Sequence, residues 1–243
     1  MDRKLMAFFV SFFVFLIIFI SFVIFSENKN MMELRNDYPD LPEEVFSLRK
    51  DNLIVWAINL VLSFLVPLLF LTTRLSQRIS IKTGDDRGLF LSGLLYGAVF
   101  FIIVFLINLP LNFYSSFYLR HKYGLSDQTF FRWLEVNIKS FLVNDLAMSL
   151  FLWIPYYIIY KSPKRWWLSL GLMLIPVLIF MVFITPFVID PIFNKYTSIE
   201  DEALGKQIQV LLDKAGVGDA DIYMVDKSRD TKTMNAYMTG ISK

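Results

Sequence analysis

Long apolar runs alternate with short polar segments along the chain as far as Ile189. A helix rises about 1.5 Å per residue, so about 20 apolar residues are needed to cross the roughly 30 Å hydrocarbon core of a bilayer. The pattern therefore predicts a membrane α-helical fold for residues 1–189, with a lipid bilayer as its surroundings. Five runs reach the required length: Leu5–Phe25, Leu53–Thr72, Leu89–Leu109, Phe141–Tyr160 and Trp166–Ile189.

Composition supports this interpretation. The 243 residues are 56% hydrophobic and 17% aromatic, whereas soluble domains have roughly 45–50% apolar residues. The net charge of +2 gives no basic footprint, so we expect no nucleic-acid partner. The first run is too long for the apolar part of a signal peptide, which spans about 7–15 residues, and it predicts an uncleaved anchor.

The basic residues between the runs predict how the chain is oriented. The positive-inside rule associates Lys and Arg near the spans with the cytoplasmic side. It places the N-terminus in the cytoplasm, and five spans then place the C-terminal segment outside the cytoplasm. The basic residues that support this orientation are Arg3 and Lys4, then Arg74, Arg78, Lys82 and Arg87, then Lys161, Lys164 and Arg165.

After Ile189 the chain becomes polar. Thr197 and Glu200 fit a capping box that would begin a helix, and Gly216 suits its C-terminal end. Short strands are predicted at Ile222–Val225 and Met234–Met238. Apolar positions at helical spacing would form one face of the helix: Leu204, Ile208, Leu211, Leu212 and Ala215.

These elements are too few to bury a core of their own. About fifty residues lie near the size at which a domain folds only with help. We therefore expect residues 190–243 to be the start of a truncated α+β domain rather than a complete one.

The chain offers little metal chemistry. It has no cysteine, and His121 is its single histidine. Zinc sites in proteins usually take three or four Cys, His or carboxylate ligands, and carboxylates alone suit harder metals. We therefore expect no metal ligands and no catalytic residues within this chain, and we assign His121 no role.

Three blocks of sequence carry a resemblance to a known family. The first runs from His121 to Thr129 and is followed by Trp133 and Lys139. The second is Asp190–Tyr196 with Ile199, Glu200 and Asp201. The third combines Asp226–Arg229 with Asn235–Gly240. In order and spacing, from about Phe117 to Gly240, the chain resembles the integral-membrane zinc metallopeptidases that include the type I CAAX prenyl protease.

The resemblance implies a zinc-binding helix beyond the third block in the full-length protein. In that family this helix carries H-E-x-x-H, with two zinc-binding His and a Glu that activates the zinc-bound water. The resemblance also implies that Asn235, Ala236 and Tyr237 bind the backbone of a substrate as an edge strand beside the zinc. From the residues alone, a plain edge strand that ends in a turn remains the alternative.

The predicted function is therefore a membrane-embedded zinc metalloendopeptidase, with zinc as the cofactor of the full-length protein. Its partner would be a peptide or protein substrate, which could be lipidated. The 243 residues contain no H-E-x-x-H, so by themselves we expect them to be inactive. A non-enzymatic membrane scaffold, a transporter component or a degenerate member of the family is the alternative.

Overall fold

The computed structural model describes residues 3–84, 86–199 and 202–236. The chain divides into two compact units. The first comprises Met1–Tyr123 with Ser149–Phe151, and the second comprises Gly124–Met148 with Leu152–Lys243.

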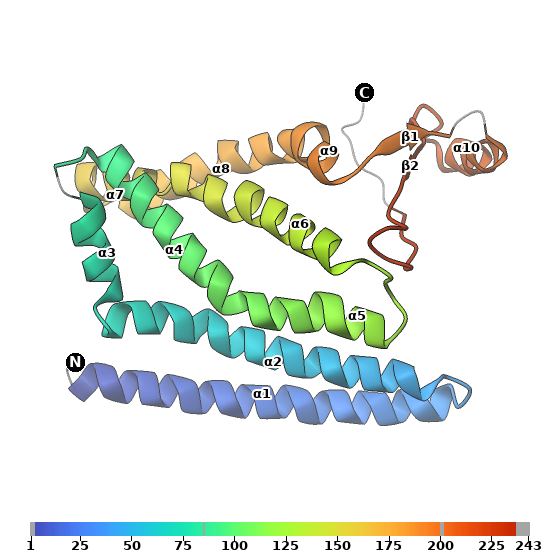
Figure 1. Cartoon of the computed structure of the whole chain (residues 1–243), viewed down its shortest axis with the longest axis horizontal. Coiled ribbons are helices and arrows are strands. Elements are labelled where there is room, and N and C mark those ends of the chain that lie inside the picture. The colour runs from blue at the N-terminus through green and yellow to red at the C-terminus, as the bar shows by residue number, and fades with distance from the viewer. Residues whose placement is uncertain (1–2, 85, 200–201, 237–243) are drawn as a thin grey trace. The chain divides into compact units, whose positions relative to one another are not determined.

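The first unit is a set of helices, shown in blue to green in Figure 1. The antiparallel α1 and α2 lie side by side, and the rings of Phe12 and Phe64 meet edge to face at 4.9 Å between centroids. The last three elements form one continuous helix, Leu89–Lys122. In order, the elements are α1 (Arg3–Asp37), α2 (Glu43–Thr72), α3 (Leu75–Gly84), α4 (Leu89–Asn112), the π-helix η1 (Phe113–Tyr118) and α5 (Leu119–Lys122).

The second unit contains further membrane-length helices and a small α+β segment. The fourth long helix is continuous from Phe130 to Lys161, and the fifth from Trp166 to Phe193. Their elements are α6 (Phe130–Ser140), η2 (Phe141–Leu146), η3 (Ala147–Leu150), α7 (Trp153–Lys161), α8 (Trp166–Ile184), η4 (Thr185–Ile189) and α9 (Asp190–Phe193). The α+β segment comprises β1 (Tyr196–Ser198), α10 (Ala203–Ala215) and β2 (Tyr223–Val225).

The predicted number of spans is confirmed. Over residues 3–84, 86–199 and 202–236, five helices are long and apolar enough to cross a membrane. They exceed the predicted runs because helical structure continues into the polar flanks at one or both ends. Their bounds are Met6–Asp37, Glu43–Thr72, Leu89–Lys122, Phe130–Lys161 and Trp166–Phe193.

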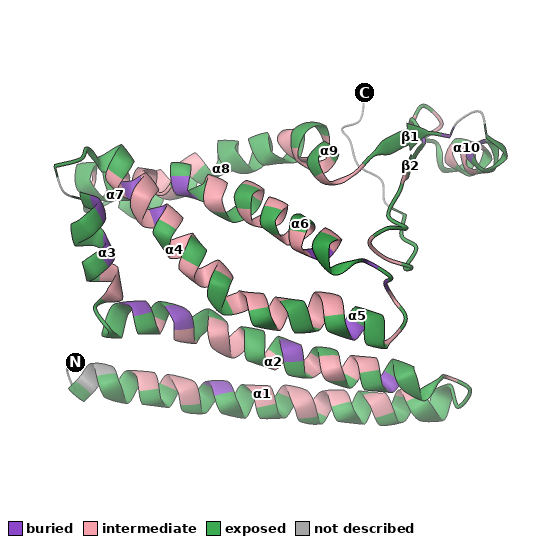
Figure 2. Cartoon of the chain, in the orientation of Figure 1, coloured by how far each residue is buried: buried purple, intermediate pink, exposed green. Residues whose placement is uncertain are grey.

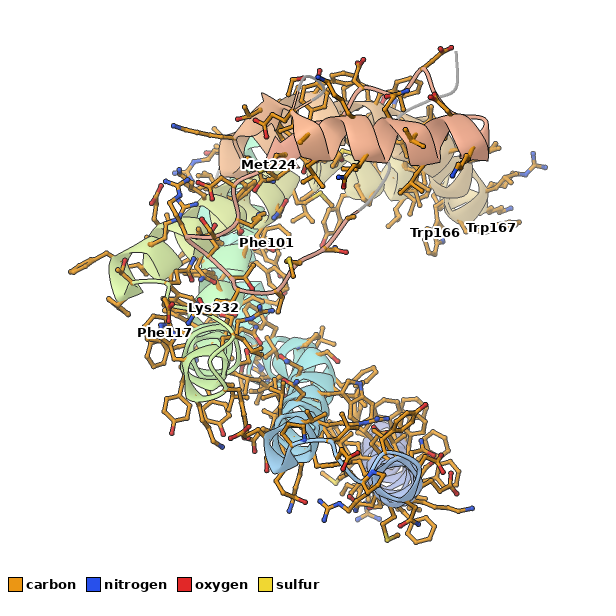
Figure 3. The ribbon with its side chains drawn as sticks, turned by 90° about the vertical axis from the view of Figure 1, so that its right-hand side faces the viewer. Phe101, Phe117, Trp166, Trp167, Met224 and Lys232 are labelled. Carbon is orange, nitrogen blue, oxygen red and sulfur yellow. The ribbon has the colours of Figure 1, made fainter. Side chains whose placement is uncertain are left out.

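The apolar side chains of these helices mostly face outward. In the most apolar window of each span, no more than 17% of residues are buried, and Figure 2 shows few buried positions among the exposed and intermediate ones along the helices. Outward apolar surface on this scale is expected where lipid is the solvent. Trp166 and Trp167 lie exposed at the start of α8 (Figure 3), a position typical of the aromatic belt at a membrane surface.

Packing inside the first unit is concentrated where α2, α3 and α4 meet. Val66, Phe70 and Ile79 form a buried cluster there. The rings of Phe70 and Phe100 meet edge to face at 4.9 Å, an arrangement that aromatic quadrupoles favour. This cluster fixes the short amphipathic α3 against its neighbours.

In the part of the chain that the structure describes, three membrane helices contain a segment of π geometry, near the C-terminal end of the third and fifth and in the middle of the fourth. η1 begins three residues after Pro110, and η4 contains Pro186. Proline lacks an N–H and its ring displaces the preceding turn, which interrupts the regular α-helical hydrogen bonds close to both segments. η2 contains no proline, and its cause is not evident from the sequence.

The segment after the fifth span differs from its prediction at two points. Thr197 lies in β1 rather than capping a helix, and α10 begins later, at Ala203. Met234–Ala236 form no strand, and the rest of that predicted strand, Tyr237 and Met238, lies outside the described residues. The strand predicted at Ile222–Val225 is present as β2, which pairs antiparallel with β1. Gly216 ends α10 in the left-handed region at φ 75°, as predicted.

Candidate functional site

The predicted substrate-binding residues lie just beyond a folded polar loop. Asn235 and Ala236 are exposed and irregular in conformation, whereas Tyr237 lies outside the described residues. The structure therefore leaves the role of all three untested. What it does define is the loop Asp226–Thr233, from which these residues emerge.

The loop is shaped by its own side chains. The Asp226 carboxylate accepts hydrogen bonds from the Ser228 backbone at 3.2 Å and from its hydroxyl at 2.6 Å. Asp230 and Thr231 both donate backbone N–H groups to the Lys227 carbonyl at 2.9 Å. Asp and Ser favour such local turns because their short side chains reach nearby backbone groups.

Asp230 joins this loop to the start of α6 within the second unit. Its Oδ1 accepts hydrogen bonds from Gln128 Nε2 at 2.8 Å and from Arg132 Nε at 3.0 Å. Its Oδ2 accepts one from Arg132 Nη2 at 3.2 Å. The Asp230 carbonyl accepts a further bond from Ser126 Oγ at 2.8 Å. We call Ser126, Gln128, Arg132 and Asp230 the Asp230 cluster.

Backbone pairing extends the contact beyond the Asp230 cluster. The Lys232 N–H donates to the Leu125 carbonyl at 2.8 Å, and the Thr231 hydroxyl reaches the same oxygen at 3.3 Å. The Lys232 ammonium, labelled in Figure 3, pairs with the Asp127 carboxylate at 2.6 Å. Contacts therefore continue along the loop as far as Lys232.

The loop before α6, Gly124–Thr129, which we call the receiving loop, has side chains and a backbone conformation that suit this contact. Gly124 adopts a positive φ of 64°, a conformation that suits glycine. Ser126 is only 2% exposed, and its Oγ accepts a hydrogen bond from the Gln128 backbone at 3.1 Å. Thr129 caps α6 by accepting from the Arg132 backbone at 3.3 Å. Arg132 is thereby held in the first turn of α6, next to Asp230.

The electrostatics of the Asp230 cluster favour ionised Asp230. Burial alone would raise the pKa of this carboxyl, because a half-buried charge loses hydration. Hydrogen bonds from Arg132 and Gln128 outweigh that loss, and the pKa of Asp230 lies below its usual value. A fork-shaped guanidinium is well matched to both oxygens of a carboxylate.

A pocket of about 360 Å³ adjoins the Asp230 cluster. Its lining comes from α6 and η2, from the end of the fifth long helix with the adjoining Asn194, and from the loop Asp226–Thr233. Asn194 Oδ1 is buried here without a hydrogen-bond partner among the residues that the structure describes. The lining residues are Val136, Ser140, Asn144, Ile189, Asp190, Phe193, Asn194, Lys227 and Asp230.

The residues present do not fit a zinc ion. Over residues 3–84, 86–199 and 202–236 no group of three or more His, Cys, Asp or Glu side chains could hold a metal. His121 lies at the end of the third long helix, where its Nδ1 is 2.7 Å from the Phe117 carbonyl oxygen of the preceding turn. The family's zinc therefore has no ligand set in the described part of the chain.

Sequence reasoning identified the two loops but missed the contacts that join them. Ser126 and Gln128 lie inside the first resembling block, whereas Asp230 lies one residue beyond Asp226–Arg229. A usable signal was the acidic residue directly after Asp226–Arg229, together with the basic residue Arg132 shortly after the first resembling block. The pairing itself spans 98 positions of sequence, and no local pattern reveals contacts at that separation.

Five membrane-length helices with a polar segment after the fifth define a multi-pass integral membrane protein. Comparison with known proteins specifies its class further. Residues 46–195 match the family model described as CAAX prenyl protease N-terminal, five membrane helices. The chain therefore belongs to this family.

Relatives with known names agree. The chain is 31% identical over 140 residues to the uncharacterized metalloprotease YhfN of Bacillus subtilis, covering 58% of this chain and 33% of that protein. It is 34% identical over 139 residues to CAAX prenyl protease 1 of Saccharomyces cerevisiae, covering 56% and 30%. The chain thus spans about a third of the length of these relatives.

A solved structure supports the same fold. The crystal structure of S. mikatae Ste24p superposes with a TM-score of 0.67 at 25% sequence identity. The match covers 82% of this chain and 48% of that one. The fourth long helix ends at Lys161, well short of 82% of the chain, so the similarity must also include residues outside the first four spans and their connections.

Proposed function

We propose that this chain is the N-terminal part of a membrane-embedded zinc metalloendopeptidase that resembles the CAAX prenyl proteases. The observation that carries the proposal is the family match over residues 46–195, which covers all or most of four of the five spans. The reaction would be peptide-bond hydrolysis by zinc-activated water. The zinc ligands would come from residues outside these 243.

The segment Asp190–Lys243 would begin the peptidase domain. Its mixed α+β content supports this assignment, since β1 and β2 pair and α10 lies between them in sequence. The helix leaves large apolar side chains exposed, with Leu204 at 54% and Leu211 at 63%. Such a surface is expected where further structure packs against a small element.

Asn235, Ala236 and Tyr237 would bind the substrate backbone. An extended peptide can add to an exposed strand through main-chain hydrogen bonds, and a small Ala leaves room for its approach. The exposure of Asn235 and Ala236 supports accessibility. The substrate would be a peptide or protein, and the names of several relatives suggest a prenylated one.

The test begins with the coding sequence downstream of Lys243. An in-frame H-E-x-x-H within a few tens of codons is expected, and the full-length product should cleave a fluorogenic prenylated CAAX peptide. Cleavage should stop on removal of zinc with a chelator and return when zinc is added. Absence of the motif together with absence of cleavage would overturn the proposal in favour of a non-enzymatic membrane protein.

A further inference from the structure

We propose that Asp230 and Arg132 are positioning residues for the substrate-binding segment at Asn235. This inference rests on the proposed function, because it assigns a means of alignment to that same site. It concerns the contact between the loop Asp226–Thr233 and the loop before α6. Nothing in the resemblance assigns a role to either residue.

Only a few residues separate the anchored loop from Asn235. Among the described residues, Lys232 is the last whose backbone is fixed to the loop before α6, through its bond to Leu125. The Thr233 backbone is still held, because it donates to the Thr231 hydroxyl at 3.1 Å. Met234 is 99% exposed, and Asn235 follows directly. Three residues reach at most about 11 Å, so the anchored loop limits where Asn235 can lie.

The anchor itself depends on a charge pair. The Asp230 and Arg132 side chains are only 19% and 18% exposed. Their two-point contact fixes orientation as well as distance, because the guanidinium and carboxylate planes must match. Gln128 and Ser126 add bonds to the carboxylate and the backbone of the same residue. Together they hold the loop in one place and one orientation.

The two partners differ in what their loss leaves behind. Arg132 also donates to Glu135 at 3.1 Å, so it keeps a charge partner when Asp230 is neutralised. When Arg132 is replaced, Asp230 keeps its hydrogen bond from Gln128. Its half-buried negative charge, however, loses the positive guanidinium that compensated it. A buried group left without its partner is costlier than a pair removed together. Arg132→Gln should therefore disturb the loop more than Asp230→Asn.

Positioning and mere structural support predict different kinetics. A loosely anchored loop would weaken substrate alignment in every enzyme molecule, which raises KM and lowers kcat. A variant that only lowers the fraction of folded enzyme would lower kcat and leave KM unchanged. The ratio of these two effects distinguishes the two roles.

The experiment uses the full-length product and the fluorogenic prenylated CAAX peptide. Asp230→Asn should raise KM and lower kcat/KM roughly ten- to a hundredfold, since small misplacements of a substrate are costly. Asp226→Asn is the matched control, because the Asp226 carboxylate bonds to Ser228 of its own loop. That variant should leave KM near the wild-type value.

A chemical bridge supplies the rescue. Residues 1–243 contain no cysteine. Once any cysteine elsewhere in the full-length product is replaced by serine, Asp127→Cys with Lys232→Cys gives one defined pair at the positions of the 2.6 Å ion pair. A short bifunctional thiol-reactive reagent should bridge this pair and restore a low KM to the Asp230→Asn enzyme. Bridging efficiency itself reports whether the loops remain together, independently of activity.

The outcomes separate the inference from the function on which it rests. Wild-type enzyme that fails to cleave the peptide overturns the proposed function and, with it, the positioning role. Active wild-type enzyme whose KM is unchanged by Asp230→Asn overturns the positioning role alone. If the Asp230→Asn enzyme loses bridging but keeps its KM, the positioning role is also overturned, because the contact between the loops would then be structural only.

Discussion

Asp230 is ionised and mostly shielded from solvent, because its neighbours replace the water it loses. Its carboxylate accepts three hydrogen bonds, two of them from the Arg132 guanidinium. Hydrogen bonds to charged groups make a net contribution of about 1.5–3 kcal/mol each. A single residue can therefore hold together two loops that are far apart in the sequence.

The contact should weaken in acid. The pKa of Asp230 lies below its usual value, so the folded state favours the carboxylate more than the unfolded state does. Its stabilisation is fully present above the usual carboxyl pKa of about 4 and is lost as the pH falls through the lowered folded value. The Lys232 amide reports this contact because it donates to the Leu125 carbonyl. Its protection from hydrogen exchange, corrected for intrinsic exchange, should fall as the pH drops below about 4. Protection that stays constant between about pH 6 and pH 3 would contradict the role of the carboxylate.

Asn235 is the residue on which the proposed substrate contact depends. Asn235→Ala should lower kcat/KM about two- to tenfold in the full-length enzyme, since loss of one neutral hydrogen bond costs about 0.5–1.5 kcal/mol. Helix content should be unchanged, because Asn235 is exposed. Met234→Ala serves as the control at the neighbouring position, which is also exposed. An Asn235→Ala enzyme with wild-type kcat/KM would remove this residue from the site.

Among the elements, α10 shows which local signals are reliable. Its apolar spacing and its glycine terminus were predicted from sequence, and both are present. Gly216 has φ 75°, and a Cβ added there would meet open space, so conformation rather than crowding selects glycine. A left-handed conformation costs a residue with a Cβ about 1–2 kcal/mol.

Gly216→Ala should therefore destabilise the end of α10 by about 1 kcal/mol. Amide exchange in the last turn of α10 should accelerate about fivefold, because 1.4 kcal/mol corresponds to a factor of ten in an opening equilibrium. Gly171→Ala is a suitable control: it also has open space around its Cβ but a negative φ inside α8. If the amides in the last turn of α10 exchange equally fast in both variants, the left-handed conformation of Gly216 does not contribute to the stability of this helix end.

The elements that were missed depend on distant partners. The capping box at Thr197 was overridden because Thr197 pairs with Met224, and Ile199 donates to the Ile222 carbonyl at 3.2 Å. These bonds satisfy backbone groups that a helix start would otherwise have to cap. The Asp230 cluster likewise joins Ser126 to a residue 104 positions later. The spans were predictable because membrane-spanning helices satisfy their backbone within one segment, whereas loop contacts carry no such local signature.

For the whole molecule, the number of spans and the loop contacts are consistent with each other. If each of five helices crosses once, the connection after the third and the segment after the fifth share one side of the membrane. The bonds from Asp230 and Lys232 to the Gly124–Thr129 loop require the same arrangement. The connections after the second and fourth spans then lie on the opposite side, and these carry exposed basic residues: Arg74, Arg78, Lys82, Arg87, Lys161, Lys164 and Arg165.

This assignment of the connections to two sides of the membrane predicts which positions a membrane-impermeant reagent labels from the same side. Single cysteines are cleanly interpretable because the chain contains none of its own. Asp127→Cys and Lys232→Cys should react with a membrane-impermeant maleimide from one side, and Lys82→Cys and Lys164→Cys from the other. The positive-inside rule assigns the second pair to the cytoplasm, which would place residues 190–243 outside it. Labelling of positions 127 and 164 from the same side would show that the fourth long helix does not cross, whatever the orientation of the rest.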